Sequence, residues 1–374
     1  MAVVSALLAS ASLGACGGED AISGSGESAE AQVVPAGPAE GELKISNWPL
    51  YIDPGKDGTI AEFERESGID VEYVEEINDN VQFFGKIQPQ LAEGESGGRS
   101  LITVSDWLAG QMHELGYLHE FDKSELPNVE DNLIPALRGA DADPNRDFTV
   151  PWQSGMTGLI VRTDLAPEID EMADLFDPKY KGKVDMLSEM RDTVPMTLKS
   201  MGIDPDEATQ EEWLEAVDVI DRAADSGQIR RFTGNDYIRD LASGDVVAAL
   251  GWSGDAVQLQ KDNPDIEFVM PEEGCMLWST SLEIPVGAPN PQAAQEFINF
   301  VYDPEVQADI AEYVNYVTPV SGVKEILAER DPELARNELI FPTKEYTADC
   351  SFEPVLGGAD GEEITKAFQD AISG

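Results

Sequence analysis

The stretch GELKISNWPLYIDPGKDGTIAEFERESGIDVEYV, residues 41–74, passes from an apolar strand pattern through a helical pattern to a second strand pattern. Residues 43–46 predict a strand, residues 59–66 predict a helix that ends at Gly68, and residues 69–74 predict the next strand. Because strands that alternate with helices form parallel pairs, the stretch predicts an α/β fold with a largely parallel sheet.

The same alternation continues to the C-terminus. We expect helices over residues 81–91, 106–115, 291–302, 305–314 and 362–372, and extended segments over residues 101–104, 148–150, 156–161, 246–251 and 281–286. Thr209 and Glu212 form a capping-box pattern that begins another helix, whose predicted apolar face consists of Trp213, Val217, Ile220 and Ala224. A chain of 374 residues exceeds the usual size of one core, so we expect two domains.

The chain is strongly acidic. It contains 73 Asp and Glu against 24 Lys and Arg, a formal net charge of −49. This charge excludes nucleic acid as a partner, because phosphate binding needs a basic surface. Two interpretations of the acidity stay open: it attracts a cationic ligand, or it keeps the surface hydrated, as in a salty medium. The second is favoured, since charges are screened beyond about 8 Å at physiological salt.

The first forty residues predict an export signal and a tether. Residues 2–15 form a short apolar run that ends in Leu13-Gly14-Ala15-Cys16 and resembles a bacterial lipoprotein signal, in which the Cys becomes the lipidated first residue of the mature chain. The alternative is a buried helix with a free thiol at Cys16. Such signals carry Lys or Arg before the apolar run, and none is present, so we read the signal over residues 1–15 as truncated. Residues 16–40, rich in Gly, Ser, Glu and Pro, predict a flexible tether.

Two of the three cysteines, Cys275 and Cys350, lie in the folded part of the chain. An even pair in an exported chain favours a disulfide over two separate buried thiols. The sequence has no Cys-x-x-Cys or Cys/His ligand spacing, so we expect no metal site.

Residue patterns for catalysis are sparse. His113 and His119 are the two histidines of the sequence, without the spacing of a metalloprotease and without a nearby activated Ser or Cys. The sequence also lacks a nucleophile elbow, a phosphate-binding loop and a dinucleotide fingerprint. We therefore expect a protein that is not an enzyme and that uses no cofactor. An exported glycosidase with paired carboxylates is the rival from another class.

Four tryptophans follow predicted strand ends: Trp48, Trp107, Trp252 and Trp278. Tyr51 and Tyr316 occupy similar positions. Two α/β lobes bind ligands in the crevice at the carboxyl ends of their strands, so these rings are expected to face a cleft. Aromatic faces attract an alkylammonium by about 0.5–2 kcal/mol each. Sugar clefts use the same rings, so aromatics alone do not separate the two ligands.

Several short motifs follow one another from residue 42 onward. They are SNWPLYI (46–52), DPKYKGK (177–183), DYI (236–238) with GD (244–245), GWSGD (251–255), PEEG (271–274) before Trp278, and Tyr316 before Thr318-Pro319. In this order and spacing they resemble the spermidine/putrescine-binding proteins of bacterial ABC importers. The resemblance implies an α/β, two-lobed periplasmic-binding-protein-like fold of type II, with the cleft between the lobes.

The resemblance also implies the ligand-binding residues, which are Trp48, Tyr51, Ser105, Trp107, Glu189, Asp192, Trp252, Asp255, Trp278, Thr280 and Tyr316. The aromatic residues would wall the ligand, and Glu189, Asp192 and Asp255 would meet its amines. Trp107 replaces what is often Tyr in the family, and Thr280 stands where the family commonly has Asp. Glu283 cannot substitute for that Asp, because strand alternation points it to the opposite face. The ligand therefore stays open between a polyamine, a shorter diamine, a monoamine and an amino acid derivative.

The implied lobe one comprises residues 41–152 and 279–323, and lobe two comprises residues 153–278 and 324–374. The implied function is capture of a cationic solute, such as putrescine or spermidine, by lobe closure, and delivery to the permease and ATPase subunits of an importer. We expect a monomer, exported and lipid-anchored to the outer face of the cytoplasmic membrane, in the periplasm or at the cell surface. The alternative is a binding protein for a sugar, an anion or ferric ion.

Overall fold

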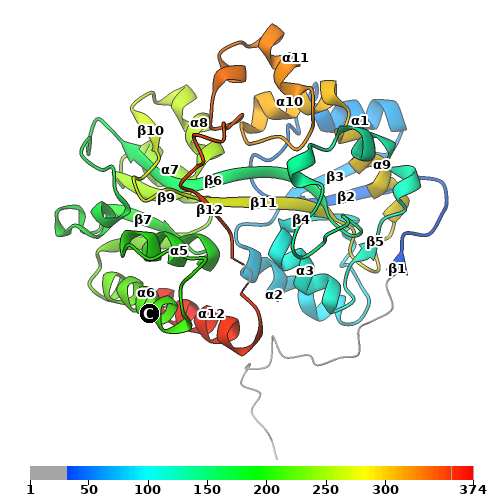
Figure 1. The fold of residues 1–374 in the computed structure, drawn as a ribbon. Coiled ribbons are helices and arrows are strands. Elements are labelled where there is room, and N and C mark those ends of the chain that lie inside the picture. Colours follow the sequence, from blue (N-terminus) through cyan, green and yellow to red (C-terminus); the bar gives the residue numbers. More distant parts are fainter. Residues whose placement is uncertain (1–31, 355, 374) are drawn as a thin grey trace, which may run out of the picture.

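The computed structural model describes residues 32–354 and 356–373, which form a ten-stranded mixed sheet covered by helices and a separate two-stranded sheet (Figure 1). The strands are β1 Gln32–Val33, β2 Glu42–Asn47, β3 Asp70–Glu75, β4 Leu101–Ser105, β5 His119–Glu120, β6 Val150–Arg162, β7 Val184–Leu187, β8 Ile229–Thr233, β9 Ala248–Trp252, β10 Ile266–Val269, β11 Met276–Glu283 and β12 Ser351–Phe352. The α-helices are α1 Thr59–Ser67, α2 Asn80–Leu91, α3 Asp106–Glu114, α4 Pro127–Asn132, α5 Met190–Ser200, α6 Gln210–Asp225, α7 Tyr237–Ser243, α8 Ser253–Asp262, α9 Pro291–Val301, α10 Pro304–Val314, α11 Val323–Arg330 and α12 Gly358–Ile372. The predicted signal and Cys16 lie outside the described residues.

The large sheet has two parallel parts joined by two antiparallel strands. Its order is β3-β2-β4-β11-β6-β9-β7-β8, with β10 paired to β6 and β12 paired to β11. The β3, β2 and β4 strands are parallel to one another, and so are β8, β7 and β9. The β11 and β6 strands are antiparallel to each other and to their outer neighbours β4 and β9. The expected parallel sheet is thus present twice, and β6 and β11 form the connection between its two copies.

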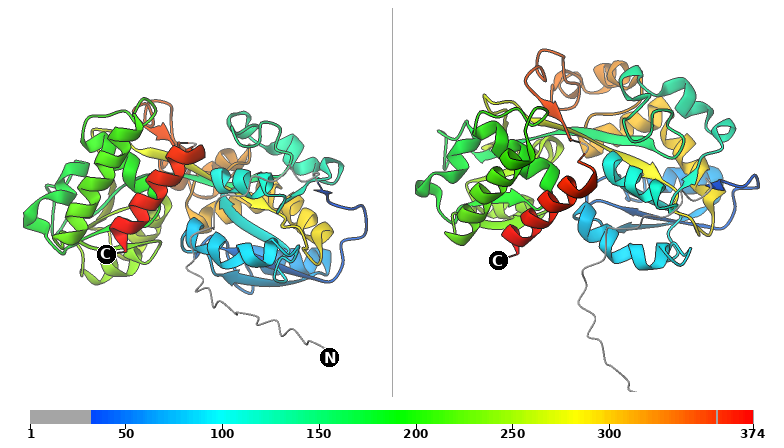
Figure 2. Two further views of the ribbon diagram at one scale, coloured as in Figure 1. Left: turned by 90° about the horizontal axis from the view of Figure 1, so that it is seen from below. Right: turned by 60° about the horizontal axis from the view of Figure 1, so that its bottom comes forward.

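This arrangement divides the molecule into two lobes. Figure 1 shows β6 and β11 running from one half of the molecule to the other, and Figure 2 shows the halves side by side, with α12 packed on the half that contains α5 and α6. The carboxyl ends of both parallel parts face the junction: β2 and β4 end there from one lobe, and β7, β8 and β9 from the other. A site at this junction is therefore supplied by strand ends from both lobes.

Most of the predicted helices are present with nearly the expected bounds. In α6, Thr209 accepts a hydrogen bond from the backbone N–H of Glu212 and the Glu212 carboxylate accepts one from Thr209 N, so the predicted capping box is confirmed. The apolar face of α6 packs against α5 and α12 around Trp213 and Phe368. Ala216 and Ala223 are the buried alanines of α6, whereas the predicted Ala224 is partly exposed.

Two expected extended segments are one strand. Pro151 and Gly155 interrupt the apolar pattern between residues 148–150 and 156–161, but β6 runs without a break from Val150 to Arg162. Proline is tolerated near the start of a strand. The glycine is required, because a Cβ at position 155 would lie 2.4 Å from the Trp278 ring.

The segment that precedes the first large strand is packed against the body of the protein. The β1 strand pairs with β5, Val34 N donates to the Glu120 carbonyl, and Val34 is buried. Gln292 donates a hydrogen bond to the Pro35 carbonyl at 2.7 Å. Residues 32–35 of the predicted tether therefore contact the folded part of the chain, where Val34 is buried and Val33 is exposed.

Within the described residues, the helices are too short or too polar to cross a membrane.

Candidate functional site

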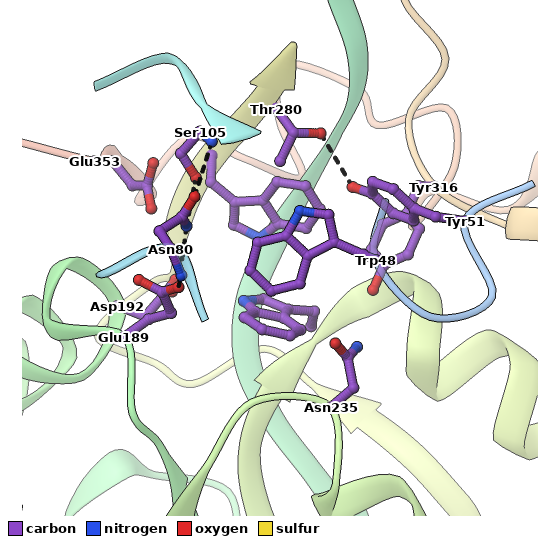
Figure 3. Close-up of a pocket in the computed structure, with 12 residues that line it drawn as sticks. Trp48, Tyr51, Asn80, Ser105, Glu189, Asp192, Asn235, Thr280, Tyr316 and Glu353 are labelled. Atoms are coloured by element: carbon purple, nitrogen blue, oxygen red, sulfur yellow. Dashed lines mark hydrogen bonds between the residues drawn. The ribbon is translucent and has the colours of Figure 1, made fainter. Parts of the chain in front are cut away.

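A cavity lies at the junction of the two lobes (Figure 3), and the space between its lining atoms, open solvent included, is about 390 Å³. The residues that line it are Trp48, Tyr51, Asn80, Ser105, Glu189, Asp192, Asn235, Trp252, Trp278, Thr280, Tyr316 and Glu353. Nine of these twelve belong to the eleven ligand-binding residues predicted from the sequence. Trp107 and Asp255 are the two predicted residues that do not line it.

Aromatic rings form a continuous wall of the cavity. Trp48 and Trp252 meet edge to face with ring centroids 5.8 Å apart, Trp252 and Trp278 are 6.4 Å apart, and Trp278 and Tyr316 are 5.2 Å apart. Tyr51 continues the series, 5.3 Å from Tyr316. The Trp48 ring is fixed by a hydrogen bond from its Nε1 to the Thr103 carbonyl at 3.1 Å. Such a wall covers apolar methylene groups and attracts a cation.

The strand β11 places two of the lining residues differently from the prediction. The sequence pattern predicts Trp278 and Thr280 beyond a strand end, with a separate strand over residues 281–286, but β11 begins at Met276 and contains both. Its register places Trp278 opposite Gly155 and Thr280 opposite Gln153 on β6. The two side chains therefore project from one face of a regular strand, and their spacing is set by the strand itself.

Two carboxylates enter the cavity from the start of α5. Glu189 is the residue that precedes the helix and Asp192 lies in its first turn, so both belong to a helix N-terminus. Glu189 Oε1 accepts from Asn80 N at 2.6 Å and from Asn80 Nδ2 at 3.0 Å. Asp192 accepts from Thr157 Oγ1. The partial positive charge of the helix N-terminus favours ionised groups at both positions.

A third carboxylate, Glu353, comes from the C-terminal segment. The β12 strand pairs with β11, and Glu353 N donates to the Leu277 carbonyl at 2.9 Å, which brings the side chain to the cavity. The disulfide between Cys275 and Cys350, with Cα atoms 4.4 Å apart, joins the same two segments. Glu353 is thus delivered by a covalent and a hydrogen-bonded connection to the strand that carries Trp278.

Burial raises the pKa of all three carboxyls. The pKa of Asp192 is raised by burial to about 6, against hydrogen bonds from Thr157 and Trp252 that lower it. The pKa of Glu189 is raised well above its usual value by burial and by the nearby charge of Asp79. Burial and the charge of Asp192 act in the same direction on the pKa of Glu353. A cation in the cavity would favour the ionised forms of these groups.

Arg191 is the cationic side chain adjoining this group. Its guanidinium lies 3.7 Å from the centre of the Trp107 ring, and its pKa is lowered by burial and raised by Glu353 and Glu189. Trp107 therefore supports Arg191 and does not reach the cavity as predicted. Its position at the second residue of α3 turns the ring away from the strand ends.

Asp255 lies behind the wall of the cavity. It is 2% exposed and accepts hydrogen bonds from Tyr237 Oη at 2.6 Å, from Tyr316 Oη at 2.7 Å and from Asn235 Nδ2 at 3.0 Å. The prediction that Asp255 meets a ligand amine is not supported by this geometry, since all three donors belong to the protein. Asp255 instead holds Tyr316 and Asn235 in position.

Hydrogen bonds join the two lobes across the cavity. Besides the pair of bonds between Asn80 and Glu189, Ser188 Oγ donates to Asp79 at 2.7 Å, and Asn235 N donates to Asn78 Oδ1 at 3.2 Å. Gly234 allows this approach, because a Cβ there would lie 1.8 Å from the Asn78 carbonyl oxygen. The lobes are thus in direct contact around the cavity, as in a closed binding protein.

The sequence prediction missed three lining residues, Asn80, Asn235 and Glu353. Asn80 and Asn235 follow β3 and β8, and Asn80 directly precedes the helix predicted over residues 81–91. The tryptophans are candidates because they follow predicted strand ends. Asn80 also follows a strand, so the same criterion would identify it if amide side chains were considered as well as aromatic ones. Glu353 follows the two-residue β12, which the sequence pattern does not predict; the pairing of β12 with β11 and the disulfide between Cys275 and Cys350 bring it to the site.

Comparisons with known proteins agree with this geometry. The family model described as bacterial extracellular solute-binding protein matches residues 58–342. The spermidine/putrescine-binding periplasmic protein of Escherichia coli is 27% identical over 319 residues, which cover 85% of this chain and 88% of that protein. A putrescine-binding periplasmic protein of the same organism is 28% identical over 327 residues, 82% of this chain and 84% of that protein.

A solved structure has the same fold. The putative spermidine/putrescine ABC transporter protein from Listeria monocytogenes superposes with a TM-score of 0.78 at 27% identity, over 88% of this chain and 98% of that chain. The two-lobed fold expected from the motifs is therefore confirmed. Because the family model covers most of the sequence and the curated relatives match over most of their length, this chain belongs to the family of bacterial extracellular solute-binding proteins.

Proposed function

We propose that this chain is the extracytoplasmic solute-binding component of an ABC importer and that it captures a small alkylammonium solute of the polyamine class. The observation that carries the proposal is the composition of the cavity: Glu189, Asp192 and Glu353 lie beside a wall of aromatic rings. Rings cover methylene groups and attract cations, and carboxylates form charge-assisted hydrogen bonds with ammonium groups. The curated relatives are named as spermidine/putrescine-binding and putrescine-binding proteins, and these names support the same ligand class.

Capture would proceed by closure of the lobes. We place lobe one at residues 41–152 and 279–323 and lobe two at residues 153–278 and 324–374, so that two crossings fall within β6 and β11 and the third at the start of α11. The contacts of Asn80 with Glu189 and of Asp79 with Ser188 support this division, since each would form only in the closed state. The closed form would then dock on the permease and ATPase subunits. The chain would act as a monomer and would release its ligand chemically unchanged.

A thermal-shift panel of polyamines, amino acids and sugars tests the proposal. A ligand at 100 times its dissociation constant stabilises the folded protein by about 2.7 kcal/mol. We expect a rise in melting temperature with alkylamines and none with sugars. A response to sugars alone would contradict the proposed ligand class.

Ligand binding should weaken at low pH. The buried Asp192, with a pKa of about 6, must lose its proton to pair with an ammonium, so affinity should fall about tenfold from pH 7.5 to pH 5.

The stability of the free protein should depend on pH in the opposite direction. The pKa of Asp192 is about 6 in the folded protein and about 3.9 in the unfolded chain. This difference stabilises the folded protein fully at pH values below about 3.9. The stabilisation is lost as the pH rises through about 6. The ligand-induced shift in melting temperature should therefore be larger at pH 7.5 than at pH 5. A pH-independent shift in wild type, or an unchanged pH dependence in Asp192→Asn, would contradict this role.

We further propose that Cys16 anchors the protein to the membrane through a lipid. The supporting observation is the sequence Leu13-Gly14-Ala15-Cys16 after an apolar run. When the chain is expressed behind a complete signal, Cys16→Ser should move the protein from the membrane fraction to the soluble fraction. The double variant Cys275→Ala with Cys350→Ala, which retains Cys16, is the control. Equal fractionation of Cys16→Ser and wild type would refute the anchor.

A further inference from the structure

The cavity has two chemically different ends. Figure 3 shows Glu189, Asp192 and Glu353 on one side of the indole rings, and Thr280, Tyr51 and Tyr316 on the other. At the second end Tyr51 Oη lies 3.3 Å from Thr280 Oγ1, and the Tyr51 and Tyr316 rings are 5.3 Å apart. One end of the cavity therefore presents carboxylates, and the other presents the hydroxyl groups of Tyr51 and Thr280, since the Tyr316 hydroxyl donates to Asp255 behind the wall.

The carboxylate nearest to the hydroxyl end is already occupied. Asp255 accepts three hydrogen bonds, from Tyr316, Tyr237 and Asn235, and does not line the cavity. An ammonium placed beside Thr280 would face the hydroxyls and not a free carboxylate. A buried cation without a charged partner is costly, so this end disfavours a second ammonium.

Two neutral side chains that neighbour Thr280 in the sheet, Trp278 and Gln153, have polar atoms without partners among the described residues. The indole Nε1 of Trp278, a residue 7% exposed, has no hydrogen-bond partner within residues 32–354 and 356–373. The same holds for both amide atoms of the fully buried Gln153, which is paired with Thr280 in the sheet. Buried polar groups are normally paired, so unpaired donors and acceptors beside a cavity indicate what its ligand supplies.

The strand β6 relates the two ends. Alternation points the side chains of Gln153, Gly155 and Thr157 to one face. Thr157 is bonded to Asp192 at the acidic end, Gly155 lies under the Trp278 ring, and Gln153 is opposite Thr280. Four residues of strand span about 13 Å. These three residues do not line the cavity, but behind its wall they connect the hydrogen-bond partner of Asp192 with the unpaired amide beside Thr280, over the length of a short alkyl chain.

We propose, building on the proposed function, that the preferred solute is asymmetric: it carries one cationic amine, held at the Glu189 and Asp192 end, and one uncharged hydrogen-bonding group, an amide or a hydroxyl, held at the Thr280 end. An amide offers a carbonyl to the Trp278 N–H and an N–H to the hydroxyl oxygens. Monoacylated diamines and amino alcohols have this chemistry. Symmetric diamines do not.

Calorimetric titration of the wild-type chain with ligands of one chain length tests the proposal. The probes are N-acetylputrescine, 4-amino-1-butanol, putrescine and 4-aminobutanoate, with spermidine as the longer polyamine. We expect N-acetylputrescine or 4-amino-1-butanol to bind at least tenfold more tightly than putrescine. Equal or tighter binding of putrescine or spermidine would overturn the asymmetric ligand while leaving the proposed function intact. Tightest binding of 4-aminobutanoate would overturn it as well, and no binding by any amine would overturn both.

A pair of variants at Thr280 provides the second test. Thr280→Asp supplies the missing carboxylate and should raise putrescine affinity at least tenfold while lowering that for N-acetylputrescine, which inverts the ranking. Thr280→Val, of the same shape but without the hydroxyl, should give no gain for putrescine. An unchanged ranking in folded Thr280→Asp would overturn the proposal. If that variant does not fold, the wild-type ranking decides alone.

Discussion

Combining Glu189→Gln with Asp192→Asn is expected to lower the affinity for an alkylammonium ligand at least a hundredfold. Each substitution removes one charge-assisted hydrogen bond, which contributes about 1.5–3 kcal/mol. The Gln carbonyl can still accept from Asn80, so the contact between the lobes is retained. The melting temperature of the free protein should not fall, because the raised pKa values of Glu189 and Asp192 show that their ionised forms are unfavourable in the empty cavity. Calorimetric titration and thermal unfolding measure the two effects.

The chain offers a matched control on α6. Glu215 and Asp218 are exposed, have the same three-residue spacing as Glu189 and Asp192, and lie on a helix that does not contribute to the cavity. Glu215→Gln with Asp218→Asn changes the net charge equally and should leave the affinity unchanged. Equal losses in the two double variants would show that the charge of the whole protein, and not the cavity, attracts the ligand.

Removal of the disulfide should produce the largest loss of stability. The bridge joins residues 75 apart in the sequence, and a loop of that size corresponds to about 4 kcal/mol in the chain-entropy estimate, an upper value. Cys275 is fully buried in an apolar cluster, so alanine is the suitable replacement at both positions. Cys275→Ala with Cys350→Ala should lower the free energy of unfolding in denaturant, and should weaken ligand binding because Glu353 is then held by β12 pairing alone.

Reductant provides the control for this prediction. Wild type should lose stability on reduction, whereas the double variant should be insensitive to it. Intact-mass analysis without reductant should show Cys275 and Cys350 protected from alkylation. Two freely alkylated thiols, or equal stability of wild type and variant, would contradict the expected role of the bridge.

The sequence is most informative where a residue follows a strand of a parallel pair. Trp48, Ser105 and Trp252 lie at such strand ends, so their meeting follows from the topology of the sheet. Trp278 and Thr280 reach the cavity for a different reason, since they project from within β11. Their position depends on antiparallel pairing with β6, which the alternation of strands and helices does not reveal.

Side-chain direction explains the two predicted residues that miss the cavity. Asp255 follows Trp252, which predicts a ligand contact, but in the first turn of α8 its carboxylate points toward Tyr237 and Tyr316. Trp107, in the first turn of α3, turns toward Arg191. Position along the chain locates a residue near a strand end, whereas the helix that follows determines the direction of its side chain.

Equilibrium dialysis with isotope-labelled putrescine and N-acetylputrescine tests the central claim, capture of an alkylammonium solute without chemical change, most directly. We expect saturable retention of one ligand per chain, displaced by other alkylamines and not by sugars, with all of the label recovered as the original compound. Retention should be lost in the Glu189→Gln and Asp192→Asn double variant and kept in its α6 control. Failure to retain either compound at high protein concentration, or recovery of the label in a converted product, would contradict it.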